Sequence, residues 1–220
     1  MTVLLLILVF AVIWWWLRSI KIPQQNVAGS LGVLPERFII FDLETTGLRA
    51  DTHEIIEIGT IRVNRDSDHH ETFQVLVKPS RKVPKRITDL TGISQGMLEA
   101  EGVPLKDALL EFRAFVGHLP MVAFNADFDS GFLKSACSSV SVDHFDNDLY
   151  CALKLARRAF PDLPSYKLSE LSKLGNLTIA NEHRALADCQ RALIVYAASA
   201  QKLGFAGKPV STLKPAKPPV

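Results

Sequence analysis

Residues 38–47 read FIIFDLETTG, a short apolar run that ends in two acids. The apolar part, 38–41, has the composition of a buried strand. Asp42 and Glu44 lie two residues apart, so both carboxylates project from the same face of that strand. Two neighbouring carboxylates beside an apolar strand repel each other unless a cation or a proton compensates. Surface acids on an edge strand are the alternative, but the apolar flank favours a central strand whose end opens into a site.

Strand and helix patterns alternate over the rest of the domain. Further strand-like runs follow at 54–63, 72–77 and 121–124. Apolar residues recur at helical spacing in five segments, at 105–116, 128–136, 148–159, 167–174 and about 184–203. Three strands first, with helices interleaved later, predict an α/β layered domain built on a mixed sheet.

A second acidic element, NADFDSGFL at 125–133, directly follows the strand-like run 121–124. Asp127 and Asp129 are two residues apart at the start of a helix, and therefore about 200° apart around its axis. Only one of them can face a centre shared with the first two acids. The other is expected to cap the helix or to lie in solvent.

The third element is HRALAD at 183–188. If both residues were helical, His183 and Asp188 would lie about 140° apart around the axis. We therefore expect His183 to approach Asp188 from the loop before the helix. A lone histidine near a helix start is usually solvated or a capping residue, so this element carries little weight by itself.

Taken together, FDLETTG, NADFDSGFL and HRALAD resemble the three exonuclease motifs of the DEDDh family of 3′-5′ exonucleases, in the same order. That family includes the proofreading (epsilon) subunit of bacterial DNA polymerase III. EIIEIG at 54–59, LTGIS at 90–94 and SYKL at 165–168 extend the resemblance, which covers about 36–203. It implies a ribonuclease-H-like fold, a mixed five-stranded sheet with helices on both sides. The sequence departs from the family pattern at Phe124 and at 151–153, and neither position is an expected metal ligand.

The resemblance implies a general base, His183, and four metal-binding carboxylates, those of Asp42, Glu44, Asp129 and Asp188. Four carboxylates and no thiol suit hard cations, so we expect two Mg²⁺ or Mn²⁺ ions and no zinc. One ion would lower the pKa of a bound water and the other would stabilise the leaving 3′ oxygen. Histidine, with an ordinary pKa of about 6.5, is suited to take the proton of that water. The expected activity removes nucleoside 5′-monophosphates from single-stranded 3′ ends, with DNA favoured over RNA.

Substrate contacts are predicted in two places. The resemblance suggests that Thr45 and Leu48 pack near the terminal nucleotide, although Leu48 could equally belong to the core. Four cations also fall within six residues, at Arg81, Lys82, Lys85 and Arg86. They could contact a phosphate backbone or form an ordinary solvated turn.

Other functions remain open from the sequence. A membrane-anchored nucleic-acid-binding or adaptor module could keep the same fold, and the exonuclease could act on RNA. The complete set of four carboxylates and His183 favours hydrolysis over the adaptor. The tail at 207–220, GKPVSTLKPAKPPV, is not recognisable as a polymerase-recruiting segment, so no polymerase partner is evident.

Residues 3–17 read VLLLILVFAVIWWWL, an unbroken apolar run. As a helix it would cover roughly 22 Å, or about 30 Å if it continues through Ile22, which is just enough to span a bilayer. Arg18 and Lys21 follow the run and no small-residue cleavage pattern comes after it, which argues against a secretory signal peptide. A buried helix of the domain is the remaining alternative. We expect residues 3–22 to be a single-pass anchor in a bacterial-type inner membrane, with the catalytic domain on the cytoplasmic side.

Length and composition set the remaining organisation. The 220 residues, 24.4 kDa, suit one mid-sized domain with accessory segments. We expect an anchor at 1–22, a linker at 23–35, the exonuclease domain at 36–205 and a flexible Pro/Lys tail at 206–220. Three cysteines without a C-x-x-C pair argue against a disulfide framework and a cysteine zinc site, and suit a reducing compartment. Six of the 25 Lys and Arg residues but one of the 23 Asp and Glu residues lie outside 38–205, so the domain itself is slightly acidic.

Overall fold

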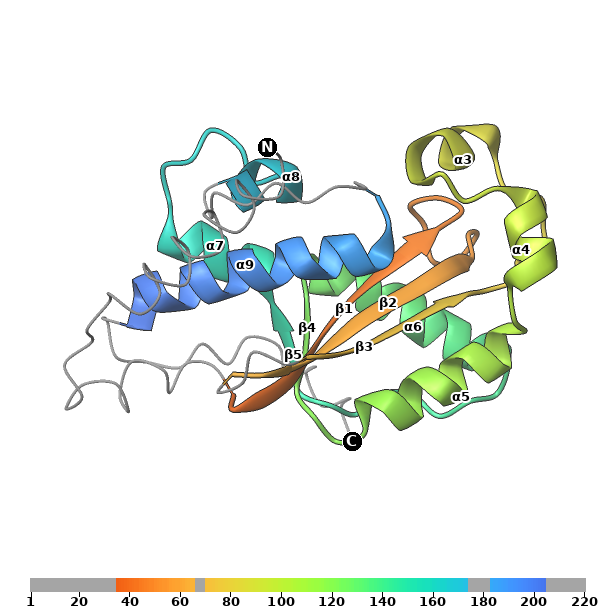
Figure 1. Cartoon of the computed structure of the whole chain (residues 1–220), viewed down its shortest axis with the longest axis horizontal. Helices are drawn as coiled ribbons and strands as arrows, with labels where there is room; N and C mark the ends of the chain where they lie inside the picture. Colours follow the sequence, from red (N-terminus) through yellow and green to blue (C-terminus); the bar gives the residue numbers. More distant parts are fainter. Residues whose placement is uncertain (1–34, 66–69, 174–182, 205–220) are drawn as a thin grey trace, which may run out of the picture.

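The computed structural model of the protein describes residues 35–65, 70–173 and 183–204. These residues form a five-stranded sheet flanked by helices (Figure 1). The strands are β1 (Arg37–Thr45), β2 (Ile55–Asn64), β3 (Glu71–Leu76), β4 (Met121–Ala123) and β5 (Leu149–Cys151). Their order in the sheet is β3-β2-β1-β4-β5, so β1 is the central strand.

The sheet is mixed, as predicted. β2 runs antiparallel to both β1 and β3, whereas β4 runs parallel to β1 and β5 runs parallel to β4. The predicted α/β architecture is therefore confirmed. The central position of β1 also excludes the alternative that Asp42 and Glu44 are surface acids on an edge strand.

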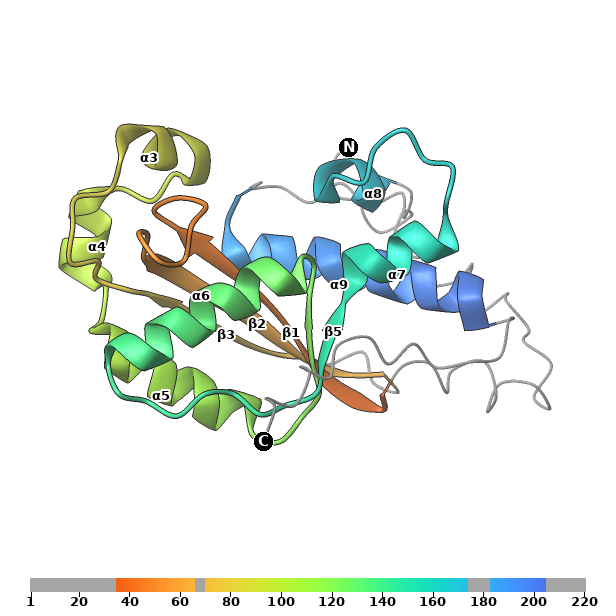
Figure 2. The same cartoon turned by 180° about the vertical axis from the view of Figure 1, so that it is seen from behind.

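Helices cover both faces of the sheet. Within the described ranges they are α3 (Lys85–Thr91), α4 (Gln95–Glu101), α5 (Leu105–Val116), α6 (Ala126–Ser139), α7 (Ala152–Ala159), α8 (Leu168–Lys173) and α9 (Ala185–Gly204). α9 crosses the face seen in Figure 1, and α6 covers the opposite face, seen in Figure 2. The elements therefore form three layers, with the sheet in the middle.

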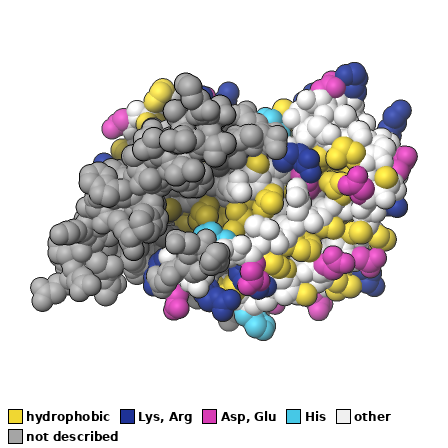
Figure 3. Space-filling model, in the orientation of Figure 1, with side chains coloured by type: hydrophobic (Ala, Val, Ile, Leu, Met, Phe, Trp, Pro, Cys, Tyr) yellow, Lys and Arg dark blue, Asp and Glu magenta, His cyan; other side chains and the backbone are white. Residues whose placement is uncertain are grey.

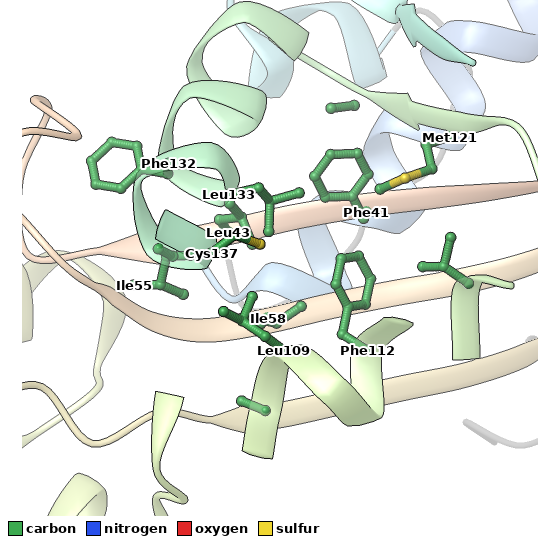
Figure 4. Close-up of a cluster of buried hydrophobic side chains, with 14 of the residues drawn as sticks. Phe41, Leu43, Ile55, Ile58, Leu109, Phe112, Met121, Phe132, Leu133 and Cys137 are labelled. Atoms are coloured by element: carbon green, nitrogen blue, oxygen red, sulfur yellow. The ribbon is translucent and has the colours of Figure 1, made fainter. Parts of the chain in front are cut away.

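Alternation along β1 divides the core between the two faces. Phe41 and Leu43 point into a cluster with α5 and α6 (Figure 4). Ile40 points to the other face, where it packs in a cluster with α7 and α9. Because side chains alternate along a strand, Asp42 and Glu44 continue the face that α9 covers. The pattern that builds the core also directs both acids toward α9.

The start of α9 lies directly on β2. A Cβ atom added to Gly59 would lie 2.5 Å from the backbone carbon of Ala185 and the backbone nitrogen of Leu186. Glycine is therefore required at this position, since any side chain would collide with backbone atoms. Cys189 Sγ adds a hydrogen bond to the Gly59 carbonyl, 3.2 Å away. These contacts fix how far α9 stands from the sheet.

The helix predicted over 148–159 is wrong at its start. Leu149–Cys151 form β5, which pairs with Met121–Ala123 of β4, and α7 begins at Ala152. A three-residue strand followed at once by a helix is too short to show a period of two. Pairing with β4, which is distant in sequence, decides the conformation of these residues.

The sequence patterns also do not predict α3 or α4. Each helix has seven residues, too few for a helical period to stand out. Gly92 follows α3 with a left-handed φ of 72°, and Ser94 Oγ accepts a hydrogen bond from the Met97 backbone N–H at the start of α4. The predicted turn at 90–94 is thus the junction of two short helices.

Several predictions fall on other parts of the chain. The anchor at 1–22, the linker at 23–35 except Pro35, and the tail at 206–220 lie outside the described residues. No helix within the described ranges combines the length and the apolar character that crossing a bilayer requires. The three cysteines are buried and unbridged, at Cys137, Cys151 and Cys189.

Candidate active site

Three carboxylates from two elements meet at the end of β1. One oxygen from each of Asp42, Glu44 and Asp188 lies within 4.8 Å of the other two. β1 supplies the first two from one face, and the first turn of α9 supplies the third. The pairing register of β1 with β2 shifts between Glu44 and Thr45, so regular pairing ends just beyond the acids. The three carboxylates therefore come together at the end of the central strand, where the sequence predicts a site.

A buried cation orients Asp188. Arg191 Nη1 donates to Asp188 Oδ1 at 2.6 Å, and Arg191 is only 3% exposed. The two residues lie one turn apart on α9. A carboxylate in the first turn of a helix is further stabilised by the helix dipole. α9 therefore holds the Asp188 carboxylate in a defined orientation toward β1.

Asp129, in the first turn of α6, lies beside Asp42. After burial, the charge of Asp129 is the largest cause of the raised pKa of Asp42. Asp129 is buried, and the backbone N–H of Leu43 hydrogen-bonds its carboxylate. It is outside the group of three described carboxylates whose oxygens lie within 4.8 Å of one another. Asp129 therefore lies beside Asp42 but is not one of the group of three.

Asp127 faces the other way, as the 200° separation predicts. It is exposed, and its Oδ2 lies 2.9 Å from Lys154 Nζ on α7. Only Asp129 of this pair of acids faces the carboxylate group. The geometry of a helix start thus distinguishes two acids that look alike in the sequence.

Burial and mutual repulsion raise the pKa values of these carboxyls. The pKa of Asp42 is raised well above its ordinary value, first by burial and then by the charges of Asp129, Glu44 and Asp188. The pKa of Glu44 is raised to about 8, by burial and then by the charge of Asp188. Burial likewise raises the pKa of Asp129 to about 8. The group cannot be fully ionised at neutral pH without a compensating cation.

The donor set fits a hard divalent cation. The group of three offers carboxylate oxygens, and oxygen is the ligand atom that Mg²⁺ and Mn²⁺ prefer. A divalent ion would also remove the repulsion that raises the pKa values of these carboxyls. The residues present are therefore suited to the expected metal.

His183 lies in the turn directly before α9, as expected. Its φ of 60° is in the left-handed region, which residues other than glycine seldom adopt. The side chain is exposed and shares a cavity of about 250 Å³ with Asp188, Arg191 and Lys167. The expected base and one of the expected metal ligands thus face the same cavity.

The two expected substrate residues differ in exposure. Leu48 is 76% exposed, which excludes the alternative that it belongs to the core. Thr45 is buried, and its hydroxyl donates to the Gly47 carbonyl at 2.6 Å. Thr45 therefore shapes the turn from which Leu48 projects.

The basic run, residues 81–86 with the four cations named above, is exposed at those cations and anchored in part. The backbone N–H groups of Ser80 and Arg81 donate to the Glu54 carboxylate, and the Arg81 guanidinium donates to the Thr52 carbonyl at 2.9 Å. These contacts tie the run to the loop that follows β1. Lys and Arg side chains stand out at the end of the molecule where α3 lies (Figure 3).

Sequence reasoning missed two charged residues beside the site, Glu57 and Arg184. Glu57 is fully buried in β2 and forms an ion pair with Arg184, the residue after His183. The signal was an acid inside the apolar strand segment IIEIG, because a buried charge almost always has a partner. The identity of that partner, 127 residues away, needed the structure.

The profile of the RNase T exonuclease family matches residues 39–196, well over half of the chain. The chain belongs to this exonuclease family. The match spans all three motifs, so the family resemblance expected from them is confirmed. Members of this family are exonucleases, which are hydrolases of phosphodiester bonds.

Named relatives include replicative proteins. The chain is 32% identical over 188 residues to the DNA polymerase III subunit epsilon of Aquifex aeolicus, covering 86% of this chain and 89% of that protein. It is also 32% identical over 169 residues to the PolC-type DNA polymerase III of Halalkalibacterium halodurans, covering 77% of this chain. It spans only 12% of that much longer relative.

Solved structures show the same fold. Exonuclease X in complex with 5′ overhanging duplex DNA has a TM-score of 0.60 and 24% identity, covering 78% of this chain and 93% of that one. E. coli Exonuclease I in complex with a dT13 oligonucleotide has a TM-score of 0.67 and 20% identity, covering 78% and 42% of the two chains. The ribonuclease-H-like fold is therefore confirmed.

Proposed function

We propose that this protein is a metal-dependent 3′-5′ exonuclease that removes nucleoside 5′-monophosphates from single-stranded 3′ ends by a two-metal-ion mechanism. The observation that carries the proposal is the meeting of Asp42, Glu44 and Asp188 within 4.8 Å, with Asp129 beside Asp42. These three carboxyls are half-buried and Asp129 is buried. Carboxyls with raised pKa values are costly to keep ionised, and such groups are typical of functional sites.

The four carboxylates of Asp42, Glu44, Asp129 and Asp188 would hold the metal. Two Mg²⁺ or Mn²⁺ ions, when bound, would activate a water and stabilise the leaving 3′ oxygen. His183 takes a proton from the attacking water, a role open to it because it faces the Asp188 cavity and is exposed. The water oxygen bonds to phosphorus as the bond to the 3′ oxygen breaks, and that oxygen takes a proton from solvent to become the new 3′ hydroxyl of the shortened strand.

The terminal nucleotide is proposed to lie against the turn after β1. Leu48 offers an exposed apolar surface to a base, and Thr45 holds the turn that presents it. DNA is the proposed substrate, because the relative from Aquifex aeolicus is a DNA polymerase subunit and the Exonuclease I structure holds a dT13 oligonucleotide. The proposed strand is single, because another E. coli Exonuclease I structure is a complex with single-stranded DNA.

A degradation assay tests the proposal. Purified protein is incubated with 5′-labelled single-stranded DNA or RNA of the same sequence, in Mg²⁺, in Mn²⁺ and in EDTA. We expect a ladder of shortened products with either metal, faster on DNA, and none in EDTA. Asp42→Asn should abolish the ladder, because it removes a charge from the group while keeping the shape. No shortening by the wild type with either metal would contradict hydrolysis and favour the adaptor alternative.

We also propose that residues 3–22 anchor the protein as a single span in a bacterial-type inner membrane. The length of the apolar run and the position of Arg18 and Lys21 support this, with the domain at 36–205 in the cytoplasm, a linker at 23–35 and a free tail at 206–220. The full-length protein should stay with membranes through carbonate extraction, and a variant lacking 1–34 should not. Release of the full-length protein would contradict the anchor.

A further inference from the structure

Glu57 occupies a position that links the sheet to the start of α9. Its side chain is 0% exposed. Oε1 accepts from Arg184 Nη2 at 2.7 Å, and Oε2 accepts from the Ala185 backbone N–H at 2.9 Å. Gln74 Nε2 on β3 also donates to Oε1, at 2.8 Å. A single buried carboxylate therefore binds both the residue before α9 and the first residue of the helix.

The chemistry of this contact suits a rigid joint. The first N–H groups of a helix have no partner within the helix, and Ala185 finds one in Glu57. Two nitrogens of Arg184 lie within 3.3 Å of the same carboxylate. Arginine presents its donors in a planar fork that fixes direction as well as distance. The contact thus determines where the backbone of α9 begins.

The register of the sheet explains why a cation is needed at this place. Glu44 of β1 is paired directly opposite Glu57 of β2. Two acids opposite each other repel. Arg184 pairs with Glu57, and its charge lowers the pKa of Glu44, against the larger effects of burial and of Asp188. The Arg184 cation therefore pairs with Glu57 and also acts on Glu44, an acid of the proposed site.

We infer that Glu57 and Arg184 are positioning residues, whose pairing holds the turn before α9 so that His183 and Asp188 meet the carboxylates of β1. The inference rests on the proposed function. His183 precedes Arg184 directly and has a left-handed φ of 60°, a conformation that needs support from its surroundings. Asp188 N–H donates to the Arg184 carbonyl at 3.0 Å, which ties the other end of the segment to the same residue.

The variants Glu57→Gln and Arg184→Lys test the inference with small changes. Glu57→Gln keeps the size of the side chain but loses the charge and one acceptor, and Arg184→Lys keeps the charge but loses the fork. We expect kcat on a single-stranded DNA oligonucleotide to fall about 10- to 100-fold in each, the range typical of changes to residues that support metal ligands from outside. KM should change little, because neither residue faces the proposed nucleotide surface.

A second readout separates positioning from general destabilisation. Isothermal titration with Mn²⁺ alone should show weaker binding in both variants, by about 10-fold or more, and amide hydrogen exchange should quicken at Ala185. Glu71→Gln is the matched control. Glu71 lies on β3 and pairs with Arg62, which is on β2 like Glu57, but Glu71 is exposed. It should keep wild-type kcat and Mn²⁺ affinity.

The double variant Glu57→Gln/Arg184→Lys completes the test. It should be no worse than the poorer single variant, because the two residues act as one unit. Folded variants with wild-type kcat and Mn²⁺ affinity would overturn the inference while leaving the exonuclease in place. A wild type without nuclease activity would instead refute the proposed function. In that case the Mn²⁺ titration and the hydrogen exchange would still show whether the Glu57–Arg184 pair holds the start of α9. If Glu57→Gln does not fold, Arg184→Lys alone tests the inference. Arg184 is partly exposed, so its substitution should be tolerated better than that of the fully buried Glu57.

Discussion

Asp129 and Asp127 show how the start of a helix sends two neighbouring acids in different directions. Both stand in the first turn of α6, but Asp129 is buried beside Asp42 and Asp127 is exposed and paired with Lys154. Helix geometry alone separates them by about 200°. Helix geometry therefore predicts that only one of the two faces the other acids, and the family resemblance is what selects Asp129.

Asparagine at these two positions gives a matched comparison. Asp129→Asn should lower kcat by roughly 100-fold or more, because removing part of a catalytic constellation costs orders of magnitude. Asp127→Asn should keep kcat within about twofold, since exposed ion pairs contribute little. Steady-state degradation of a labelled oligonucleotide measures both, with circular dichroism as the check on folding. Equal loss in the two variants would contradict the assignment.

The raised pKa values of the carboxyls predict how stability depends on pH. Glu44 and Asp129 have pKa values of about 8 when folded, against about 4 in an unfolded chain. Between these limits the folded protein binds more protons than the unfolded chain, so the free energy of unfolding falls as pH rises from about 4 to 8. Above pH 8 this loss in the free energy of unfolding is complete.

Thermal melting in EDTA measures this dependence. The melting temperature should fall between pH 5.5 and 8.5, and by less in Asp129→Asn than in the wild type, because one titrating group has been removed. Adding Mg²⁺ should raise the melting temperature more at pH 8.5 than at pH 5.5, since ions bind the ionised carboxylates. Parallel pH curves for the wild type and Asp129→Asn would show that Asp129 does not titrate as described.

Residue-scale prediction fails where a partner is distant in sequence. Glu57 lies in an apolar strand, and nothing near it in the chain shows that Arg184 neutralises it and that the Ala185 N–H donates to it. The exposure of Leu48 was equally undecided, because a leucine after a strand suits core and surface alike. Both answers depend on which elements the fold brings together.

At the scale of elements, the close approach of α9 to β2 positions Asp188. Gly59→Ala would place a Cβ 2.5 Å from backbone atoms of α9, and backbone cannot move aside cheaply. We expect a loss of about 1–3 kcal/mol in the free energy of unfolding, the usual cost of overpacking, together with a lower kcat. Chemical denaturation and the oligonucleotide assay measure these two effects.

Gly131→Ala is the control for this substitution. Gly131 lies within α6, and a Cβ there meets no atom within 4 Å. Alanine should be neutral or should stabilise the helix by about 0.5–1 kcal/mol. If Gly59→Ala were as harmless as Gly131→Ala, the contact between α9 and β2 would be looser than described.

The basic run beside the loop after β1 is predicted to guide the strand. Arg81 is anchored to that loop through Thr52 and Glu54. Lys82 follows it in the chain, so we expect Lys82 to lie near the proposed nucleotide surface. Lys82→Glu should raise KM for a long oligonucleotide several-fold and leave kcat unchanged, because it alters backbone contacts only. Lys202→Glu, near the far end of α9, should change neither. Equal KM values in both variants would support the solvated-turn alternative.

Elements with a clear local signal could be predicted, and those without one could not. Residues 105–116 match α5, and the helix expected at about 184–203 agrees with α9 within one residue. β5 has only three residues and exists because β4 pairs with it. Short α3 and α4 depend on local capping by Gly92 and Ser94.

At the scale of the whole molecule, the mixed sheet brings three distant segments to one point. β1 is central, α6 follows its parallel neighbour β4, and α9 crosses the face onto which β1 directs its acids (Figure 1). The three motifs recognised in the sequence lie on these elements. Their meeting required the topology, which the family resemblance supplied and the structure confirms.

The central claim is that Asp42, Glu44, Asp129 and Asp188 jointly hold divalent cations. A crystal of the protein grown or soaked in millimolar Mn²⁺, with diffraction data collected at the manganese absorption edge, tests it most directly. The account predicts two anomalous peaks about 3.5–4 Å apart, bounded by these four carboxylates, and their loss in Asp42→Asn. Full density for the four side chains with no anomalous peak among them would contradict it.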